Sequence, residues 1–350
     1  RCASRRSAGS AGAAAGRERN GRVVYSRRAR PVPAPRKHPM VFLEQLWAIA
    51  RNTAVECVRQ PVTLAVLVAG TLLIVLSVPF SGFTLMDDQR MFVDLGLSTV
   101  FVCGTLLAAF LATSALSREI EVRTALTVVS KPVGRPVFVW GKFLGVAAAL
   151  SACTAFLALV LMLVDMHGTM PTVSTPYHVP VLTLGILAVA GTFAAAIWAN
   201  YFYSWNFPAS VLFIGVPALA VAYLACLVFD KDWTAIMPGA QFRGQLWIAV
   251  GMMWLGLCVL ASIAVATSTR FGQVVTLGVT FGCFVLGLMS DWLFARPLRE
   301  LTATFERMAA DGTAGSALDA AHAKWAALQA AYALVPNFQV FWLSDAVQQG

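Results

Sequence analysis

Seven long apolar stretches constrain what this chain can fold into more than any other feature. The hydrocarbon core of a bilayer is about 30 Å thick, and an α-helix needs about 20 apolar residues to cross it. Stretches of that kind occupy residues 62–80, 93–116, 138–164, 179–199, 207–229, 246–268 and 273–294. The sequence therefore predicts an all-α, polytopic membrane protein with about seven spans and a transmembrane domain over residues 62–294.

Charge is sparse and unevenly placed along the chain. Charged residues make up 12% of the sequence, against about 25% in soluble domains. Residues 1–39 hold 11 Lys and Arg and one acid, whereas the rest of the chain has 15 bases and 16 acids. The basic balance therefore belongs to this tail, and we expect no nucleic-acid partner.

The basic tail, residues 1–39, has no apolar period that could form a core. We expect it to be disordered and not native, with Met40 as the true start. Two other interpretations stay open. The tail could be an acid-poor organellar transit peptide, or a basic arm that binds anionic lipid.

The side of the membrane on which each loop lies follows from Lys and Arg, which favour cytoplasmic loops. If the N-terminus is cytoplasmic, the inner segments hold eight of these residues and the outer loops hold three. The inner segments counted are 40–61, 117–142 and 269–272, and the outer loops are 81–92, 165–178 and 230–245. The sequence thus predicts a cytoplasmic N-terminus.

Two amphipathic segments flank the apolar stretches. Residues 40–61 repeat apolar side chains at helical spacing, which predicts a helix lying in the membrane surface or a soluble helix packed on another subunit. Residues 295–350 predict two helices joined by the turn DGTAGS, forming an extracytoplasmic hairpin. No return span follows, so we expect the sequence to be a fragment that lacks an eighth helix.

The loop between the second and third stretches, residues 117–137, carries most of the inner charge. Ser117 could cap a short helix, and Glu119 and Arg123 are spaced as an i,i+4 pair. An amphipathic helix with charges at its ends could dock on a partner, because its apolar face fills a groove while its ions set the register. The alternative is a solvated anchor loop on the positive inner side.

A family resemblance favours the docking interpretation. Residues 117–145, SREIEVRTALTVVSKPVGRPVFVWGKFLG, resemble the cytoplasmic loop of ABC-2 type transporter permeases, in particular those grouped with multicopper-enzyme maturation systems. Residues 50–61, ARNTAVECVRQP, resemble the helix before that family's first span, and residues 335–347, VPNFQVFWLSDAV, its late extracytoplasmic segment. Members commonly have an even number of spans, which agrees with a missing eighth.

The resemblance implies a non-enzymatic permease subunit of the bacterial cytoplasmic (inner) membrane. Such a subunit pairs with a second permease, as a homo- or heterodimer in membrane lipid, and contacts a separate ATPase that binds ATP and Mg²⁺. The implied coupling contacts are Arg118, Glu119, Glu121, Arg123, Lys131 and Arg135. The chain has no G-x-x-x-x-G-K-[ST] phosphate loop, so we expect no cofactor, metal or catalytic residue on it. An ion-gradient-driven transporter or channel, and a non-transporting scaffold, stay as alternatives.

A few polar and small residues in or beside the spans carry further expectations. Asp94, Asp165 and Asp291 lie near span ends, where a water-exposed boundary is favoured over a proton relay. Lys142 lies inside the third stretch, and we expect its ammonium to reach back to the interface. Two G-x-x-x-G pairs, at 141–145 and 278–282, would allow close helix packing, including at a dimer interface.

Overall fold

The computed structural model describes residues 39–83, 87–121, 134–169, 177–237, 239, 241–310 and 316–341. The regular secondary structure of this part of the chain is helical, apart from one isolated β-bridge between Phe229 and Ala235. The helices are α1 (Pro39–Val58), α2 (Pro61–Ser81), α3 (Asp88–Glu121), α5 (Arg135–His167), α6 (Val179–Tyr203), α7 (Phe207–Cys226), α8 (Gly244–Ser268), α9 (Gln273–Leu288), the π-helical turn η1 (Asp291–Ala295), α10 (Arg296–Ala310), α11 (Ser316–Leu334) and the 3₁₀ turn η2 (Phe338–Phe341).

Six of these helices are long and apolar enough to cross a membrane. They are α2, α3, α5, α6, α7 and α8. A seventh span results if α9 and the helix after it, which bend by 52° at Met289–Ser290, are counted as one broken span. The prediction of an all-α, multi-pass membrane protein is confirmed.

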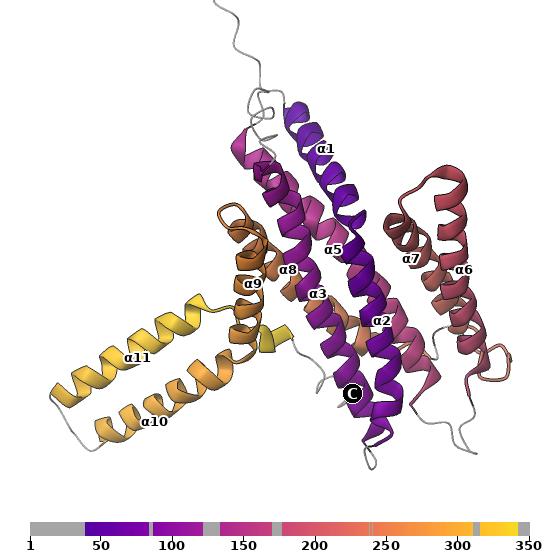
Figure 1. Cartoon of the computed structure of the whole chain (residues 1–350). Coiled ribbons are helices and arrows are strands. Elements are labelled where there is room, and N and C mark those ends of the chain that lie inside the picture. The colour runs from indigo at the N-terminus through magenta and orange to yellow at the C-terminus, as the bar shows by residue number, and fades with distance from the viewer. Residues whose placement is uncertain are drawn as a thin grey trace, which may run out of the picture. The chain divides into compact units, whose positions relative to one another are not determined.

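Proline and asparagine residues set where several helices begin. A Pro lies in the first turn of α2, α5, α6 and α7, where the missing N–H costs nothing because it would have no intrahelical acceptor. Before α7, the Asn206 side chain accepts a hydrogen bond from the Ala209 amide at 3.2 Å. Before that, Ser204 ends α6 in the left-handed region, with φ 52°, so the two helices turn tightly and lie side by side (Figure 1).

The core is built around α3, which packs on α2, α5, α8 and α9. Its large side chains Phe92, Leu97, Phe101, Leu107 and Leu111 are fully buried. Two indole hydrogen bonds tie other helices to α8. Trp254 donates to the Ser151 hydroxyl at 2.9 Å, and Trp247 donates to the Tyr223 hydroxyl at 3.0 Å. The apolar helices are therefore fixed by a few polar contacts as well as by packing.

The bend after α9 has a local cause. Pro297 has no N–H for residue 293, and its ring crowds the carbonyl at that position. The π-helical turn Asp291–Ala295 lies just before this proline, as expected when a helix absorbs such a mismatch. α10 and α11 then pack on each other, with the rings of Phe305 and His322 stacked at 4.5 Å.

Beyond α11 the chain returns to the core. Phe338 is completely buried, with its ring 6.2 Å from that of Phe101 on α3. A Cβ added at Gly287 of α9 would lie 2.6 Å from the Pro336 carbonyl oxygen, so only glycine allows this approach. The sequence predicted helices on both sides of residues 311–315, but not the return of Phe338 to the bundle.

Candidate functional site

The predicted coupling residues lie where α3 ends and α5 begins. Arg118, Glu119 and Glu121 belong to the last turns of α3, and Arg135 is the first residue of α5. Arg123 and Lys131 lie outside the described residues. Ser117 does not cap a new helix, as the sequence had suggested, because α3 continues through it to Glu121. The role of these residues in docking stays a prediction.

The helix α1 packs closely on the first turns of α5, directly beside this segment. A Cβ added at Gly145 would lie 2.5 Å from the Thr53 Cβ and 2.6 Å from the Ala50 carbonyl oxygen, and one at Gly141 would lie 2.9 Å from the Ile49 Cβ. This G-x-x-x-G pair therefore serves packing within the chain. The other pair, at Gly278 and Gly282, has no atom within 4 Å of an added Cβ.

A second contact joins α1 to α3. The Cys57 thiol is completely buried and donates to the Leu111 carbonyl at 3.6 Å. Burial raises the pKa of the Cys57 thiol to about 12, so the group stays a neutral thiol. Helices α1, α3 and α5 thus meet as one packed unit below the charged segment.

Lys142 lies within this unit and not at the surface. Its side chain is 2% exposed, and its ammonium lies 5.7 Å from the centre of the Phe138 ring, one turn earlier on α5. That geometry allows a cation–π contact. Phe138 lies nearer the start of α5, so the side chain extends back along the helix, but its ammonium is enclosed by protein. That it reaches the membrane interface stays a prediction.

The opposite end of the bundle holds a buried ion pair. Asp165, near the end of α5, has a side chain that is 2% exposed, and its Oδ1 accepts from Arg243 Nη1 at 2.7 Å. Gln89 Nε2 donates to the same oxygen, also at 2.7 Å. The expectation of a water-exposed Asp165 was wrong, because α3 and the start of α8 both supply donors to it.

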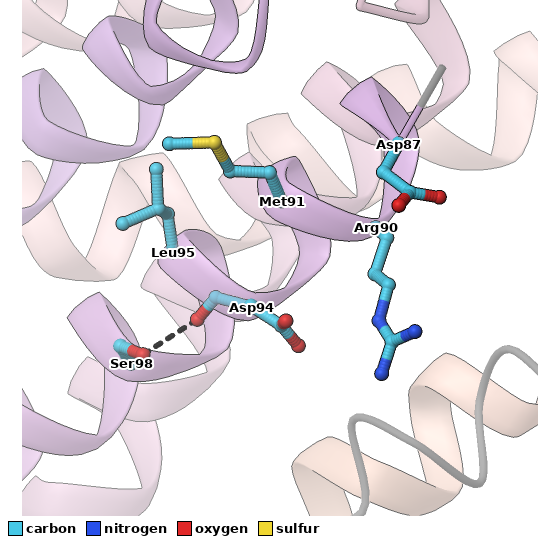
Figure 2. Close-up of a pocket in the computed structure, with 6 residues that line it drawn as sticks. All are labelled: Asp87, Arg90, Met91, Asp94, Leu95 and Ser98. Atoms are coloured by element: carbon cyan, nitrogen blue, oxygen red, sulfur yellow. Dashed lines mark hydrogen bonds between the residues drawn. The ribbon is translucent and has the colours of Figure 1, made fainter. Parts of the chain in front are cut away.

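The two other acids near span ends differ in their exposure. Asp94 is half-buried and lines a hollow of about 300 Å³ on the first turns of α3. Figure 2 shows Arg90 and Asp94 projecting from α3 toward the same side, while the Asp94 carbonyl accepts from Ser98. Asp291 forms an exposed pair with Arg299 at 3.2 Å. Asp291 is thus open to solvent, as expected at a span end. Asp94 is not, because its Oδ1 is buried and makes no hydrogen bond to the described residues.

A second buried polar group lies where α6 begins. His178 is 1% exposed, and neither ring nitrogen makes a well-aligned hydrogen bond to a described residue, although the Gln241 side chain lies close to the ring. Its pKa is lowered, first because burial disfavours the charged ring and then because of Lys231, although Gln241 and Asp230 act in the opposite direction. Neighbouring His167 stacks on Tyr177 at 5.7 Å. Burial therefore favours the neutral form of the His178 imidazole.

An apolar hollow of about 650 Å³ opens between α2, α5, α6 and α7. Val75, Val160, Ile186 and Leu219 are among its lining residues, and His167 supplies a polar group at the α5 end. Gly185 leaves its wall open, since an added Cβ there would meet no atom within 4 Å. A molecule entering this hollow would therefore meet an almost wholly apolar surface.

Sequence reasoning missed the Asp165–Arg243 pair and the buried His178. The only available signal was that Asp165, His178 and Arg243 were all assigned to loops or span ends on the same predicted side. Comparison of the chain with family models, with curated proteins and with solved structures finds no match. The assignment of function therefore depends on the geometry above and on the resemblance of residues 117–145.

Proposed function

We propose that this chain is the membrane-spanning permease subunit of an ABC-2 type ATP-binding cassette transporter, working as an exporter. The observation that carries the proposal is the charged segment 117–135, which lies between two apolar helices, α3 and α5, and resembles that family's cytoplasmic coupling loop. A separate ATPase subunit would bind ATP and Mg²⁺ and dock on this segment, and a second permease subunit would complete the transporter.

The packing around the segment supports a mechanical role. A push on the end of α3 would reach α1 through the Cys57–Leu111 contact, and a push on the start of α5 would reach α1 through Gly145 and Thr53. Tightly packed helices move as rigid units and not by local deformation. Closure of the ATPase pair would therefore tilt α1, α3 and α5 together and open or close the apolar hollow beside α5.

The finer topology belongs to the same proposal. The chain would have seven spans in the bacterial cytoplasmic membrane, with α9 and the start of α10 forming a broken span. Its N-terminus and the 117–135 segment would face the cytoplasm, as the eight inner against three outer Lys and Arg indicate. The α10–α11 hairpin would then lie on the outer side.

The test is a double charge reversal, Glu119→Lys with Glu121→Lys, in the full chain expressed together with the candidate ATPase subunit, sought as a Walker-motif reading frame beside its gene. Membrane insertion should be retained. Co-purification of the ATPase and nucleotide-dependent transport into vesicles should both fall at least ten-fold, because reversed charges repel the partner surface. The control is Glu300→Lys with Glu306→Lys on α10, which places two new lysines on the predicted outer side.

Unchanged transport and ATPase binding in the Glu119/Glu121 variant would contradict the proposal. So would labelling of a Glu121→Cys variant by a membrane-impermeant maleimide from the outside of intact cells. Transport that follows an ion gradient and ignores nucleotide would instead favour a secondary transporter.

A further inference from the structure

A second apolar hollow, of about 830 Å³, runs between α1 and α5. One wall is a stripe along α1, at Leu43, Leu46, Trp47, Ala50, Arg51, Ala54, Val55 and Val58. The other wall consists of Leu144, Ala148, Ala149 and Ala152 on α5, closed at one point by Phe213 of α7. Its volume lies within the range of about 300–1,000 Å³ that is typical of sites for small molecules.

The hollow is a built feature of the helix pair. Ile49 and Thr53 pack on the α5 glycines, and this contact fixes the distance between the two helices. The lining stripe of α1 lies on the neighbouring face, opposite three alanines of α5 that are too small to fill the space. An apolar groove thus stays open beside a close helix contact.

The charge on the described lining of the groove is positive. Among the described residues that line it, Arg51 alone is charged, and its side chain is exposed. Trp47, one turn earlier on the same stripe, is 71% exposed. A cation beside an exposed tryptophan at the edge of an apolar groove matches the region of a bilayer where phosphates meet hydrocarbon.

The position of the groove along the bundle also places it at the depth where phosphates meet hydrocarbon. The exposed aromatic side chains Tyr201, Tyr203 and Trp205 precede α7 and are typical of a membrane interface. Phe213 lies six residues into α7, about 9 Å below Phe207 at about 1.5 Å per residue. Phe213 lines the groove together with Ala148 and Ala152 of α5. Arg51 follows Ala50, which contacts Gly145 of α5, about one turn nearer the 117–135 segment than Ala148. Arg51 therefore lies close to the aromatic level.

The length of the groove fits one lipid tail. From Arg51 to Val58 the α1 wall is about 11 Å long, and from Leu43 to Val58 it is about 22 Å, at about 1.5 Å per residue. Half of a hydrocarbon core of about 30 Å is about 15 Å. An acyl chain whose phosphate lies at Arg51 would run along Ala54 and Val58 for most of one leaflet.

We propose that the α1–α5 groove is a binding site for an anionic phospholipid, with its phosphate on Arg51 and one acyl chain between α1 and α5. The lipid would fill the space beside Gly145 and hold α1 against α5. This site does not rest on the transporter proposal, because any multi-pass chain with this groove could hold the lipid. The predicted orientation places it in the cytoplasmic leaflet, where anionic lipids are enriched.

The test is titration of the purified full chain with phosphatidylglycerol or phosphatidylcholine, followed by native mass spectrometry. We expect phosphatidylglycerol to bind more tightly. Arg51→Gln should weaken phosphatidylglycerol binding about five-fold, the loss of about 1 kcal/mol expected for one cation at the surface, and leave phosphatidylcholine unchanged. Arg59→Gln is the matched control, since Arg59 is exposed in the turn directly after α1 but does not line the groove.

A second pair of variants tests the acyl-chain site. Ala148→Trp should fill the groove and remove tight binding of both lipids, whereas Ala194→Trp, at an exposed alanine of α6 outside the groove, should not. Equal weakening of phosphatidylglycerol binding by Arg51→Gln and Arg59→Gln would overturn the proposal. So would a lipid-independent dimer that Arg51→Gln or Ala148→Trp dissociates, because the occupant would then be a second copy of the chain.

Discussion

The guanidinium of Arg243 closes the end of α5 by binding the carboxylate of Asp165, with Nη1 and Oδ1 2.7 Å apart. The two side chains differ in their surroundings, since Asp165 is 2% exposed and Arg243 is 50% exposed. Gln89 adds a donor from α3. The Asp165 carboxylate therefore links three helices. Because only its partner Arg243 is open to solvent, removal of either residue should have a different effect on stability.

Arg243→Ala should destabilise the protein more than Asp165→Ala. The arginine variant leaves a buried carboxylate with Gln89 as its remaining donor, which we expect to cost about 3–5 kcal/mol. The aspartate variant leaves a half-exposed guanidinium that water can solvate, for a cost of about 1–3 kcal/mol. Thermal unfolding of the purified variants in detergent, followed by tryptophan fluorescence, measures the difference.

The exposed pair of Arg299 and Asp291 serves as the control for that comparison. Arg299→Ala should cost no more than about 1 kcal/mol, because exposed ion pairs contribute little. A smaller loss for Arg243→Ala than for Asp165→Ala would show that Asp165 is solvated in the membrane and that the network is not closed.

Gly145→Ala should loosen α1 from α5. The added methyl would lie 2.6 Å from the Ala50 carbonyl oxygen, and backbone cannot move aside cheaply, so we expect a loss of about 1–3 kcal/mol. Gly278→Ala is the matched control, because nothing lies within 4 Å of its added Cβ and alanine favours a helix by up to about 1 kcal/mol. The shift in unfolding temperature checks both. Similar shifts for the two variants would mean that the Gly145 contact is not tight.

Local hydropathy was sufficient to predict the apolar helices but not their partners. Each of the seven apolar stretches lies within or largely overlaps a helix, because burial of a long apolar run in lipid depends on the run alone. Hydropathy did not predict the bend after Leu288, because that bend depends on how Pro297 disturbs the helical turn before it. The continuation of α3 through Ser117 shows that charged residues can extend a span without starting a new helix.

Pairings over long sequence separations were not predictable in this way. Asp165 and Arg243 are 78 residues apart, and nothing in the pattern of either neighbourhood specifies the other. The same holds for Phe338, whose burial depends on Gly287 leaving room for it. The burial of Lys142 within the protein was likewise not predictable from the apolar run that contains it.

Phe338→Ala should release the returning segment from the bundle. The ring is completely buried against Phe101 and beside Gly287, and its removal should cost about 3–5 kcal/mol through lost burial and the cavity left behind. Phe80→Ala, at a 54% exposed ring of α2, is the control and should cost little. Limited proteolysis between residues 335 and 341 should become faster only in the Phe338 variant. Equal protection in both would contradict the anchoring role of this ring.

Stability should fall as the pH drops below about 6.5, because of His178. Burial lowers the pKa of its imidazole from the ordinary value of 6.5, so below that pH the unfolded chain binds a proton that the folded chain does not. Stability is then complete above the unfolded pKa and decreases toward the folded one, by at most about 1.4 kcal/mol per pH unit for one group. The pH range over which stability falls also depends on the groups that act on the pKa of this ring, which are Asp230, Lys231, Gln241 and His167.

Unfolding temperatures measured from pH 7.5 to 5.0 should show this slope in the wild-type protein and a shallower one in His178→Asn. His322→Asn, at an exposed histidine of α11, should keep the wild-type slope, and a His178 variant with an unchanged slope would show that this imidazole is not the group that titrates.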